Sequence, residues 1–231
     1  TLADMVPLTV ENLALVRMGL VELKERPLPG IAELLKSAQV STNSVPKGQE
    51  LVFRVTPRLN SAGRLRKGEV AVRLMLAANQ DEAHRMMEGL ESLNHERQAL
   101  DQRITAEALT QCKHLFTDDG VAPNAFLLSG ETWHEGVSGI VAQRVAEKYG
   151  RPALVLAPDP GQPLEWRGSG RSVPGIDLHA ALARCSHLME KWGGHSQAAG
   201  LSLRKDRTAE FRLAFEAAVA DARAAAALKF V

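Results

Sequence analysis

The chain has 231 residues, of which 45% are hydrophobic and 24% charged, and its formal net charge is +1. It is long enough to bury a core in one large domain or two small ones, while two scattered cysteines exclude a disulfide framework or a zinc-cysteine site. No apolar run approaches the ~20 residues that span a membrane, and no signal peptide opens the chain. We therefore expect a reducing, cytoplasmic setting, and any nucleic-acid site must be local because the overall charge is balanced.

The first part of the chain is expected to be helical, with breaks. The stretch TVENLALVRMGLVELKE has apolar residues at helical spacing, and IAELLKSAQ predicts a second, short helix after RPLPG. Residues 41–50 are expected to form a polar loop, and the following LVFRVTPRLNSAGRLRKG is rich in arginine and punctuated by Pro57 and Gly63. Because the chain opens on the apolar TLADMVPL without an initiator Met, we expect a piece of a longer polypeptide, cut inside a structured segment.

A long helix is predicted from about Asn79 to His114. This stretch has no proline and only one glycine, Gly89, and its apolar residues recur at helical spacing. At 1.5 Å per residue the helix would be roughly 50 Å long. One narrow apolar stripe on an otherwise polar helix favours a strut that joins two domains and docks at its ends.

The remainder predicts an α/β domain, with a boundary near residue 115. NAFLLSG and PALVLAP are strand-like, and HEGVSGIVAQRVAEKYG between them predicts a helix closed by Gly150. EWRGSGRSV is a polar strand or turn, a helix is expected from Asp177 to about Trp192, and LSL is a strand. The Ala-rich TAEFRLAFEAAVADARAAAA predicts a last helix.

GGHSQAAG, predicted as a loop between that helix and the LSL strand, contains the first candidate binding residues, Gly193, Gly194 and His195. Glycines allow a backbone to approach a ligand closely and expose N–H groups, which suits phosphate oxygens. His195 adds a donor, and a positive charge when protonated. The alternative is a tight turn with a hydrogen-bonded core histidine.

Two arginine-containing stretches hold further candidates for phosphate contacts. RGSGRS, interpreted as a second small-residue loop, contains Ser169 and Arg171, and the planar fork of an arginine matches phosphate. TPRLNSAGRLRKG contains Arg58 and Arg64, and a basic run interrupted by Pro, Asn and Gly is compatible with a surface for backbone phosphates. For both stretches the alternative is an ordinary solvated hairpin or loop.

Two single features leave a functional and a structural interpretation open. WHEGVSGI places Trp133 and His134 where a loop enters a helix, which is either an anion-binding position or a hydrophobic staple with a capping role. Asp4 in ADMVP follows an apolar stretch, as a metal ligand at a strand end does, but it is equally compatible with a turn or cap residue. One carboxylate decides nothing by itself.

Taken in order, ADMVPL, RPLPGIAELL, PRLNSAGRL, WHEGVSGIVAQRVAEKYGRPALVL, GSGRS and GGHSQAAGLSL resemble RecJ, the bacterial single-strand-specific exonuclease family of the DHH phosphoesterase superfamily. The resemblance runs essentially end to end, and GGH followed by AAG is the signature of the DHH-associated C-terminal domain. It implies an α/β fold with three parts. Residues 1–78 would end the DHH catalytic domain, 79–115 would form a connecting helix, and 116–231 a DHH-associated nucleic-acid-binding domain whose mixed sheet is flanked by helices.

The same resemblance implies part of a 5′-to-3′ exonuclease that hydrolyses single-stranded DNA with two Mn²⁺ or Mg²⁺ ions, in DNA repair and recombination. Asp4 would be the catalytic metal ligand in this chain, which lacks the Asp-x-Asp and Asp-His-His motifs. The chain alone is therefore expected to bind DNA without cleaving it. Implied partners are single-stranded DNA, a single-strand-binding protein and a RecQ-type helicase, without a membrane. The implied phosphate contacts are Arg58, Arg64, Ser169, Arg171, Gly193, Gly194 and His195.

Two other functions remain open at this point. A DHH-family phosphodiesterase for short oligonucleotides or cyclic dinucleotides would share GGH, but neither PRLNSAGRL nor so long a joining helix. A non-catalytic DNA-binding relative would have lost its metal site, and the presence of Asp4 argues against it. Aromatic residues make up only 4% of the chain, which leaves few platforms for stacking bases and favours binding through the nucleic-acid backbone.

Overall fold

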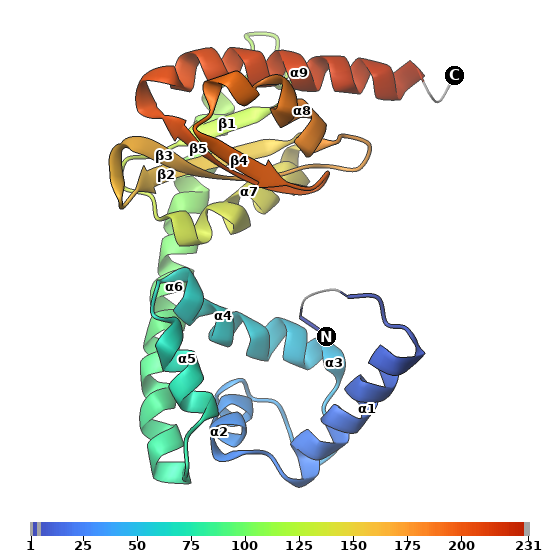
Figure 1. Cartoon of the computed structure of the whole chain (residues 1–231), viewed down its shortest axis with the longest axis vertical. Helices are drawn as coiled ribbons and strands as arrows, with labels where there is room; N and C mark the ends of the chain where they lie inside the picture. Colours follow the sequence, from blue (N-terminus) through green and yellow to red (C-terminus); the bar gives the residue numbers. More distant parts are fainter. Residues whose placement is uncertain (1, 4–5, 229–231) are drawn as a thin grey trace. The chain divides into compact units, whose positions relative to one another are not determined.

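The computed structural model describes residues 2–3 and 6–228, and the chain divides into two compact units, Thr1–Gln98 and Ala99–Val231 (Figure 1). The long helix α6 (Gln80–His114) contributes its first half to the first unit and its second half to the second. The first unit is otherwise built from α1 (Val10–Glu25), α2 (Pro29–Ser37), α3 (Gly48–Glu50), the π-helical turn η1 (Leu51–Val55), α4 (Thr56–Arg64) and α5 (Gly68–Met75).

The core of the first unit is formed by buried side chains of α2, α5 and the first half of α6. Leu34 of α2 and Leu74 of α5 are fully buried, and so is Leu90 of α6. Gly30 in the first turn of α2 permits close packing, because a Cβ there would lie 1.8 Å from the carbonyl oxygen of Leu74. In contrast, α1 buries none of its residues within the described part of the chain.

The helices predicted in this unit are confirmed, but the arginine-rich stretch is not an open loop. It runs as η1 and α4 without a break. Pro57 stands in the first turn of α4, directly after η1, where the hydrogen-bonding pattern changes from a π-helix to an α-helix, so this proline does not end the helical segment. Gly63 lies in the last turn, where it does not break the helix either.

The second unit contains a five-stranded mixed sheet, as predicted, in the order β1-β2-β3-β5-β4. Only β1 and β2 pair in parallel, and the other neighbours are antiparallel. Alternate residues of β2 face two different hydrophobic cores. Leu154 and Leu156 pack with α8 and α9, while Val155 packs with α6 and α7. The elements are β1 (Phe126–Ser129), α7 (Glu135–Tyr149), β2 (Ala153–Asp159), β3 (Gln162–Arg171), α8 (Leu178–Arg184), η2 (Ser186–Leu188), β4 (Lys191–Gly194), β5 (Ala198–Arg204), η3 (Lys205–Arg207) and α9 (Thr208–Leu228).

Two expectations for this unit are wrong in detail. The helix expected to reach Trp192 ends at Arg184, because the chain then turns through η2 into β4, which pairs with β5 and carries both glycines of GGH. RGSGRS is mostly part of β3, which confirms the strand alternative for EWRGSGRSV and not the interpretation as a small-residue loop. Its two glycines face a core, since a Cβ on Gly168 or Gly170 would lie 2.6 or 2.5 Å from a leucine side chain of β2.

Within the described residues, no helix combines the length and the apolar character needed to cross a membrane. The apolar residues of α6 are buried in two groups, around Leu90 in the first unit and around Ile104 in the second. Between these groups, residues 95 and 96 and residues 98 and 99 are exposed. The long helix is confirmed, and its buried residues fall into two groups, within 83–94 and within 101–112, separated by residues 95–100, none of which is buried.

A buried carboxylate joins α2 to α6 in the first unit. The side chain of Glu33 is only 6% exposed, and it accepts hydrogen bonds from Gln80 and Lys36. It also lies 3.0 Å from Nδ1 of His84. The hydrogen bond with His84 is the main cause that holds the pKa of Glu33 below its usual 4.5, against the burial that would raise it.

Replacement of Glu33 should therefore alter stability in a pH-dependent way. Because the pKa is lower in the folded state, the carboxylate stabilises the fold fully above pH 4.5 and loses this contribution as the pH falls through the folded-state pKa. We expect Glu33→Gln to cost about 1–3 kcal/mol at pH 7 and progressively less towards pH 3. Urea unfolding at several pH values measures the loss of stability at pH 7 and its decrease towards pH 3. Glu22→Gln, which breaks an exposed pair with Arg26, is the matched control and should have almost no effect; equal losses at pH 7 and pH 3 would contradict the prediction.

Candidate nucleic-acid interface

The β5–β4 half of the sheet exposes one face to solvent. Side chains alternate along β5, and Ala199, Leu201 and Leu203 point into the core shared with α8 and α9. Gly200 and Ser202 therefore belong to the opposite face, on which α7 packs farther along the sheet. Gly200 is exposed and Ser202 is half-buried, so this part of the face carries no helix over it.

Three neighbouring strands bring small residues into one row across this face. Ser169 of β3 pairs with Gly200 of β5, which pairs in turn with Gly193 of β4. Cationic residues flank the row on both sides, at Arg171 and at Arg167 and Lys191, and a shallow hollow runs over part of it. We call this surface the open face and define it by Arg167, Ser169, Arg171, Lys191, Gly193, Ala198, Gly200 and Ser202.

The protein itself does not require two of the glycines on the open face. Neither Gly193 nor Gly200 has a positive φ angle. A Cβ on Gly193 would meet nothing within 4 Å, and one on Gly200 would meet only the carbonyl oxygen of Gly168, at 3.8 Å. Larger residues would therefore fit, and a strand favours them. What the glycines provide is a bare backbone that another molecule can approach closely.

Gly194 has a different role, because it forms the turn. Its φ angle is 147°, and a Cβ there would lie 2.3 Å from the carbonyl oxygen of Ala198. The backbone N–H of His195 donates to that same oxygen over 2.8 Å. The two glycines of GGH are thus separated by the structure into one that the hairpin needs and one that it does not.

Arg171 lies at the edge of the open face, with most of its donors unused. Nη1 donates to the carbonyl oxygen of Gly170 over 2.8 Å, and in the described part of the chain no carboxylate pairs with the guanidinium. Burial lowers the pKa of Arg171, although an arginine remains charged at neutral pH. Gly139 of α7 makes room for it, because a Cβ at that position would lie 2.9 Å from Nη2.

Ser169 and His195 also present polar side-chain groups without a protein partner among the described residues. His195 is exposed at the tip of the β4–β5 hairpin, which excludes the interpretation as a buried core histidine. Its own backbone N–H is used in the turn, so the histidine contributes its ring and not that N–H to a ligand. Ser169 is half-buried, in the middle of the row of small residues.

Sequence reasoning did not identify Lys191 as part of this surface, and its candidate contacts included neither Arg167 of RGSGRS nor Gly200 of GGHSQAAG. Arg167 points to the open face and is held by Asp159, with 3.0 Å between Nη2 and Oδ2. Lys191 is exposed and pairs with Ser202 across the strands. The signal that could have found Arg167 is the alternation in R-G-S-G-R, which places its two arginines and its serine on one face once the stretch is taken as a strand.

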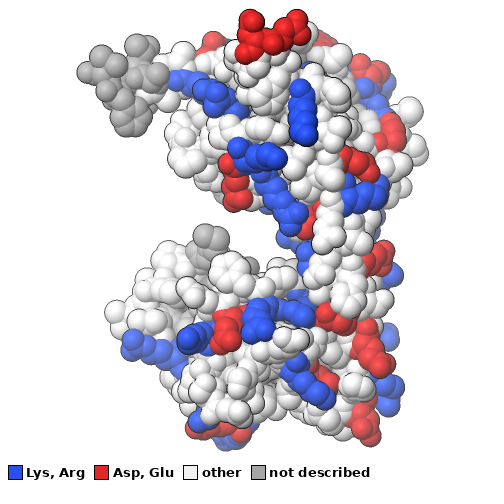
Figure 2. Space-filling view, turned by 180° about the vertical axis from the view of Figure 1, so that it is seen from behind, with Lys and Arg blue, Asp and Glu red and all other residues white. Residues whose placement is uncertain are grey.

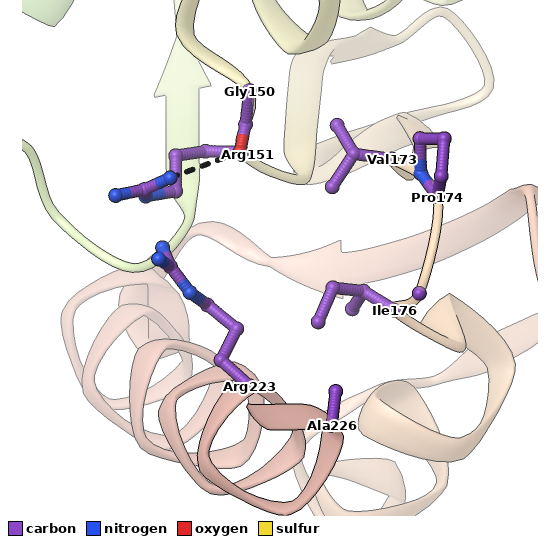
Figure 3. Close-up of a pocket in the computed structure, with 8 residues that line it drawn as sticks. Gly150, Arg151, Val173, Pro174, Ile176, Arg223 and Ala226 are labelled. Atoms are coloured by element: carbon purple, nitrogen blue, oxygen red, sulfur yellow. Dashed lines mark hydrogen bonds between the residues drawn. The ribbon is translucent and has the colours of Figure 1, made fainter. Parts of the chain in front are cut away.

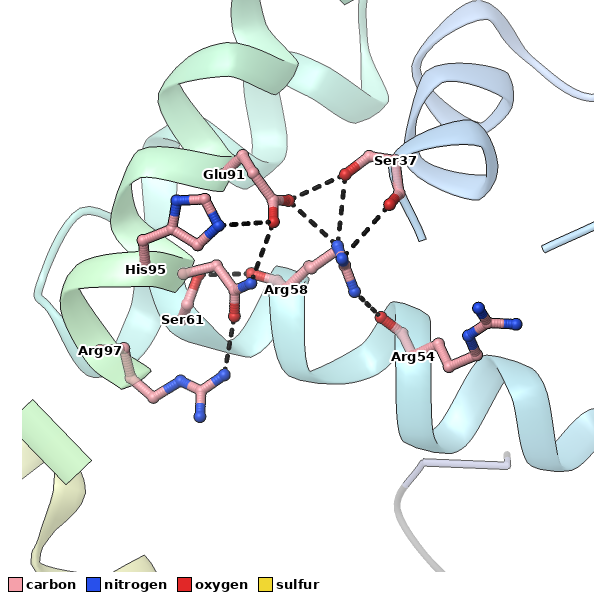
Figure 4. A network of polar contacts seen from close by, with 8 residues as sticks. Ser37, Arg54, Arg58, Ser61, Glu91, His95 and Arg97 are labelled. Carbon is pink, nitrogen blue, oxygen red and sulfur yellow. Dashed lines mark hydrogen bonds and ion pairs between the residues drawn. The ribbon is translucent and has the colours of Figure 1, made fainter. Parts of the chain in front are cut away.

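Arg58 and Arg64 belong to the first unit, where Arg58 is engaged in a polar network (Figure 4). Its Nε donates to Glu91 over 3.0 Å and its Nη1 to the carbonyl oxygen of Arg54 over 2.6 Å. Burial tends to raise the pKa of Glu91, but the hydroxyl of Ser37 and the charge of Arg58 outweigh it and lower the pKa. Arg64 ends α4, is half-buried and interacts within the chain. The candidates of the second unit lie together on and beside the part of the sheet formed by β3, β5 and β4, whereas Arg58 and Arg64 lie on α4 of the first unit.

The structural interpretation holds for WHEGVSGI. His134 caps α7, because its Nδ1 accepts a hydrogen bond from the backbone N–H of Gly136 over 3.0 Å. Trp133 is buried, and its Nε1 donates to Glu107 over 2.6 Å. Both groups are therefore used to fix the start of α7 and its packing on α6.

No metal centre is found in the described residues. Asp4 lies outside the described residues, and within them no three His, Cys, Asp or Glu side chains are close enough together to hold a metal ion. On the side shown in Figure 2, lysines and arginines are interspersed with aspartates and glutamates. A polyanion would thus be recognised by a local surface such as the open face.

Comparison with known proteins agrees with this geometry. The DHHA1 domain model matches residues 122–221, which include the whole open face. The chain is 37% identical over 220 residues to the single-stranded-DNA-specific exonuclease RecJ of Escherichia coli, an alignment that covers 93% of the chain and 38% of that protein. Over nearly its whole length, the chain is similar to part of RecJ. RecJ of Thermus thermophilus is 33% identical over 217 residues, with 94% of the chain and 30% of the relative covered.

Solved RecJ structures share the fold. The structure of Thermus thermophilus RecJ in complex with Mg²⁺ superposes with a TM-score of 0.84 at 32% identity, and covers 96% of this chain and 33% of that one. The structure of an exonuclease RecJ bound to manganese gives a TM-score of 0.78 at 31% identity, over 95% of this chain and 52% of that one. The chain thus spans about 38% of the length of its Escherichia coli relative and a third to a half of the RecJ chains solved as structures.

The two glycines of GGH should respond in opposite ways to substitution. Gly193→Val should leave the free energy of unfolding unchanged or slightly higher, because there is space for the side chain and valine favours a strand. Gly194→Val should lower it by at least about 2 kcal/mol, since the φ angle is strained for any other residue and the side chain collides with β5. Guanidinium unfolding of both variants provides the comparison. Equal losses would show that Gly193 is also a structural glycine.

Proposed function

We propose that this chain is part of a 5′-to-3′ exonuclease specific for single-stranded DNA, and that its open face holds the backbone of the strand. The name of the Escherichia coli relative, single-stranded-DNA-specific exonuclease, supports the activity. The observation that carries the binding role is the bare row of Ser169, Gly200 and Gly193. Its glycines serve neither the packing nor the conformation of the protein.

In this proposal, residues of the open face and His195 beside it share the contacts to the strand. The guanidinium of Arg171 donates to a phosphate through the N–H groups that the protein leaves unused, and the Ser169 hydroxyl donates beside it. His195, at the hairpin tip, supplies a ring N–H donor, while Lys191 adds charge from the other side of the row. All of these contacts are to the backbone, so binding is independent of base sequence.

Arg58 and Arg64 stay candidates for phosphate contacts from the first unit. For Arg58 we propose a positioning role, because Glu91 and the carbonyl oxygen of Arg54 already occupy its donors. Its network ties α4 to α2 and α6, and so fixes the helix that ends at Arg64.

We propose that the complete enzyme uses two Mn²⁺ or Mg²⁺ ions, in line with the metals named in the RecJ structures. Such ions would activate a water molecule and stabilise the leaving oxygen. The described residues contain no cluster of ligands for them, and Asp4 alone cannot hold a pair of ions that each take about six ligands. The task of this chain is therefore to position the strand, and alone it does not cleave DNA.

The same proposal includes a cytoplasmic location, a role in DNA repair and recombination, and contacts with a single-strand-binding protein and a RecQ-type helicase. These rest on the family resemblance. Similarity to RecJ over 93% of the chain, together with a 35-residue α6, favours this activity over a phosphodiesterase for short oligonucleotides or cyclic dinucleotides. The same similarity argues against a non-catalytic DNA-binding relative.

Loss of Arg171 should weaken the binding of single-stranded DNA equally for all sequences. Arg171→Ala removes a charge-assisted contact, so affinity should fall about ten- to a hundredfold, and the slope of log K against log salt should flatten by about 0.7. The measurement is fluorescence anisotropy with 5′-phosphorylated strands of several sequences over a salt series, without metal.

Arg184→Ala is the matched control, because it removes one exposed arginine of the same unit that pairs with Asp221, away from the open face. This variant should bind almost as the unmodified chain does. An unchanged salt slope for Arg171→Ala, or a loss confined to one base sequence, would mean that Arg171 has a structural role only.

A further inference from the structure

A second pocket lies at the end of the sheet where β2 begins and β3 has ended (Figure 3). One side is formed by Arg151, directly after the left-handed Gly150 that closes α7, and by Arg223 of α9. The segment that follows β3 contributes Val173, Pro174 and Ile176, and all residues of the pocket belong to the second unit.

Each of the two arginines of this pocket has a buried N–H group without a hydrogen-bond partner in the described part of the chain. Nη1 of Arg151 donates to the carbonyl oxygen of Gly150 over 3.1 Å, but its Nε is shielded from solvent and has no hydrogen-bond partner. The Nη1 atom of Arg223 is in the same situation within the described part of the chain. The pKa of Arg151 is lowered, first by burial and second by the positive charge of Arg223. Figure 3 shows both guanidinium groups on the same side of the pocket.

Such an arrangement costs free energy in the absence of an anion. Two like charges repel, and a shielded N–H without an acceptor loses its bond to water without replacement. No acidic residue lines the pocket to compensate, and no ion pair of either arginine is present in the described residues. An anion between the guanidinium groups would remove both costs at once.

We propose that this pocket binds a phosphoryl group, with Arg151 and Arg223 as its ligands. Two arginines supply a charge of +2 and planar N–H forks, which match a phosphate dianion better than a single carboxylate. The remaining wall, made of Val173, Pro174, Ile176 and Ala226, is apolar and leaves room for an uncharged part of the same ligand, such as a nucleoside.

The pocket is separate from the open face and does not depend on the proposed function. Arg171 is the last residue of β3 and lies against α7, whereas the pocket is formed by the residues after it and by α9. The phosphoryl group has two possible sources, a free phosphate or mononucleotide and a phosphodiester of a bound strand. Both sources share the chemistry that the arginines recognise.

Isothermal titration with inorganic phosphate tests the proposal on the whole chain. To isolate the pocket from the open face, the titration uses Arg171→Gln as the background. We expect saturable binding with one site, which weakens at least tenfold when Arg151→Gln or Arg223→Gln is added. Arg184→Gln, which removes an exposed arginine of α8, should leave the binding unchanged. Acetate at equal ionic strength should bind at least tenfold more weakly than phosphate.

Thermal melting distinguishes loss of a ligand from loss of the fold. Without phosphate, Arg223→Gln should melt at the same temperature as the unmodified chain or higher, because it removes a like charge and a shielded donor. Phosphate should then raise the melting temperature of the Arg171→Gln background, by about 4 °C at ten times its dissociation constant, but not that of the same background with Arg223→Gln added. No phosphate binding, binding that survives both substitutions, or acetate binding of equal strength would overturn the proposal.

Two further ligands identify the source of the phosphoryl group. Thymidine 5′-monophosphate represents the free source, and an oligonucleotide with hydroxyl groups at both ends represents the strand. Weaker binding of the oligonucleotide to Arg151→Gln would assign the pocket to a phosphodiester of the strand, and weaker binding of the mononucleotide alone would assign it to a free monoester. If Arg171→Ala leaves strand binding intact while phosphate still binds the pocket, the proposed function fails and this inference stands.

Discussion

Close packing of Gly168 and Gly170 against leucines fixes which residues of β3 reach the solvent. A Cβ on either glycine would lie within 2.6 Å of a β2 side chain, so the inner face of the strand accepts no side chain there. Because side chains alternate along a strand, Arg167, Ser169 and Arg171 are then committed to the opposite face. The small inner residues thus hold the polar outer ones in place, and a shift of register by one residue would bury two arginines in a leucine core.

The same constraint continues into β5 and β4 through cross-strand pairing. Ala199 and Leu201 face the core, which leaves Gly200 beside Ser169 and opposite Gly193. The outcome is a surface with little relief and cationic edges, although the net charge of the chain is only +1. A bare backbone next to paired and unpaired arginines is a combination that suits a sugar-phosphate chain and has no use in the packing of the protein.

Sequence patterns predicted the long helix, the mixed sheet and three candidate residues of the open face, Ser169, Arg171 and Gly193, because periodicity and glycine spacing are local signals. They placed GGH in a loop and left RGSGR between a strand and a loop, since glycine and polar residues are common in turns and the strand pairing that holds them is not visible locally. They also predicted a phosphate contact for Arg58. Its hydrogen-bond partner Glu91 is 33 residues away on another helix, so the local sequence does not reveal that the arginine is engaged. The different requirements of Gly193 and Gly194 appear only when φ angles and neighbouring atoms are known.

The central claim, that a strand lies on the open face, is tested most directly by amide chemical shifts of the ¹⁵N-labelled chain. The titrant is a 5′-phosphorylated oligothymidine, added without metal. The account predicts that the largest changes occur at Ser169, Gly193 and Gly200, while the amides of α8 on the far side of the sheet stay unchanged. Changes concentrated on α8 and α9, with Gly193 and Gly200 unaffected, would contradict it.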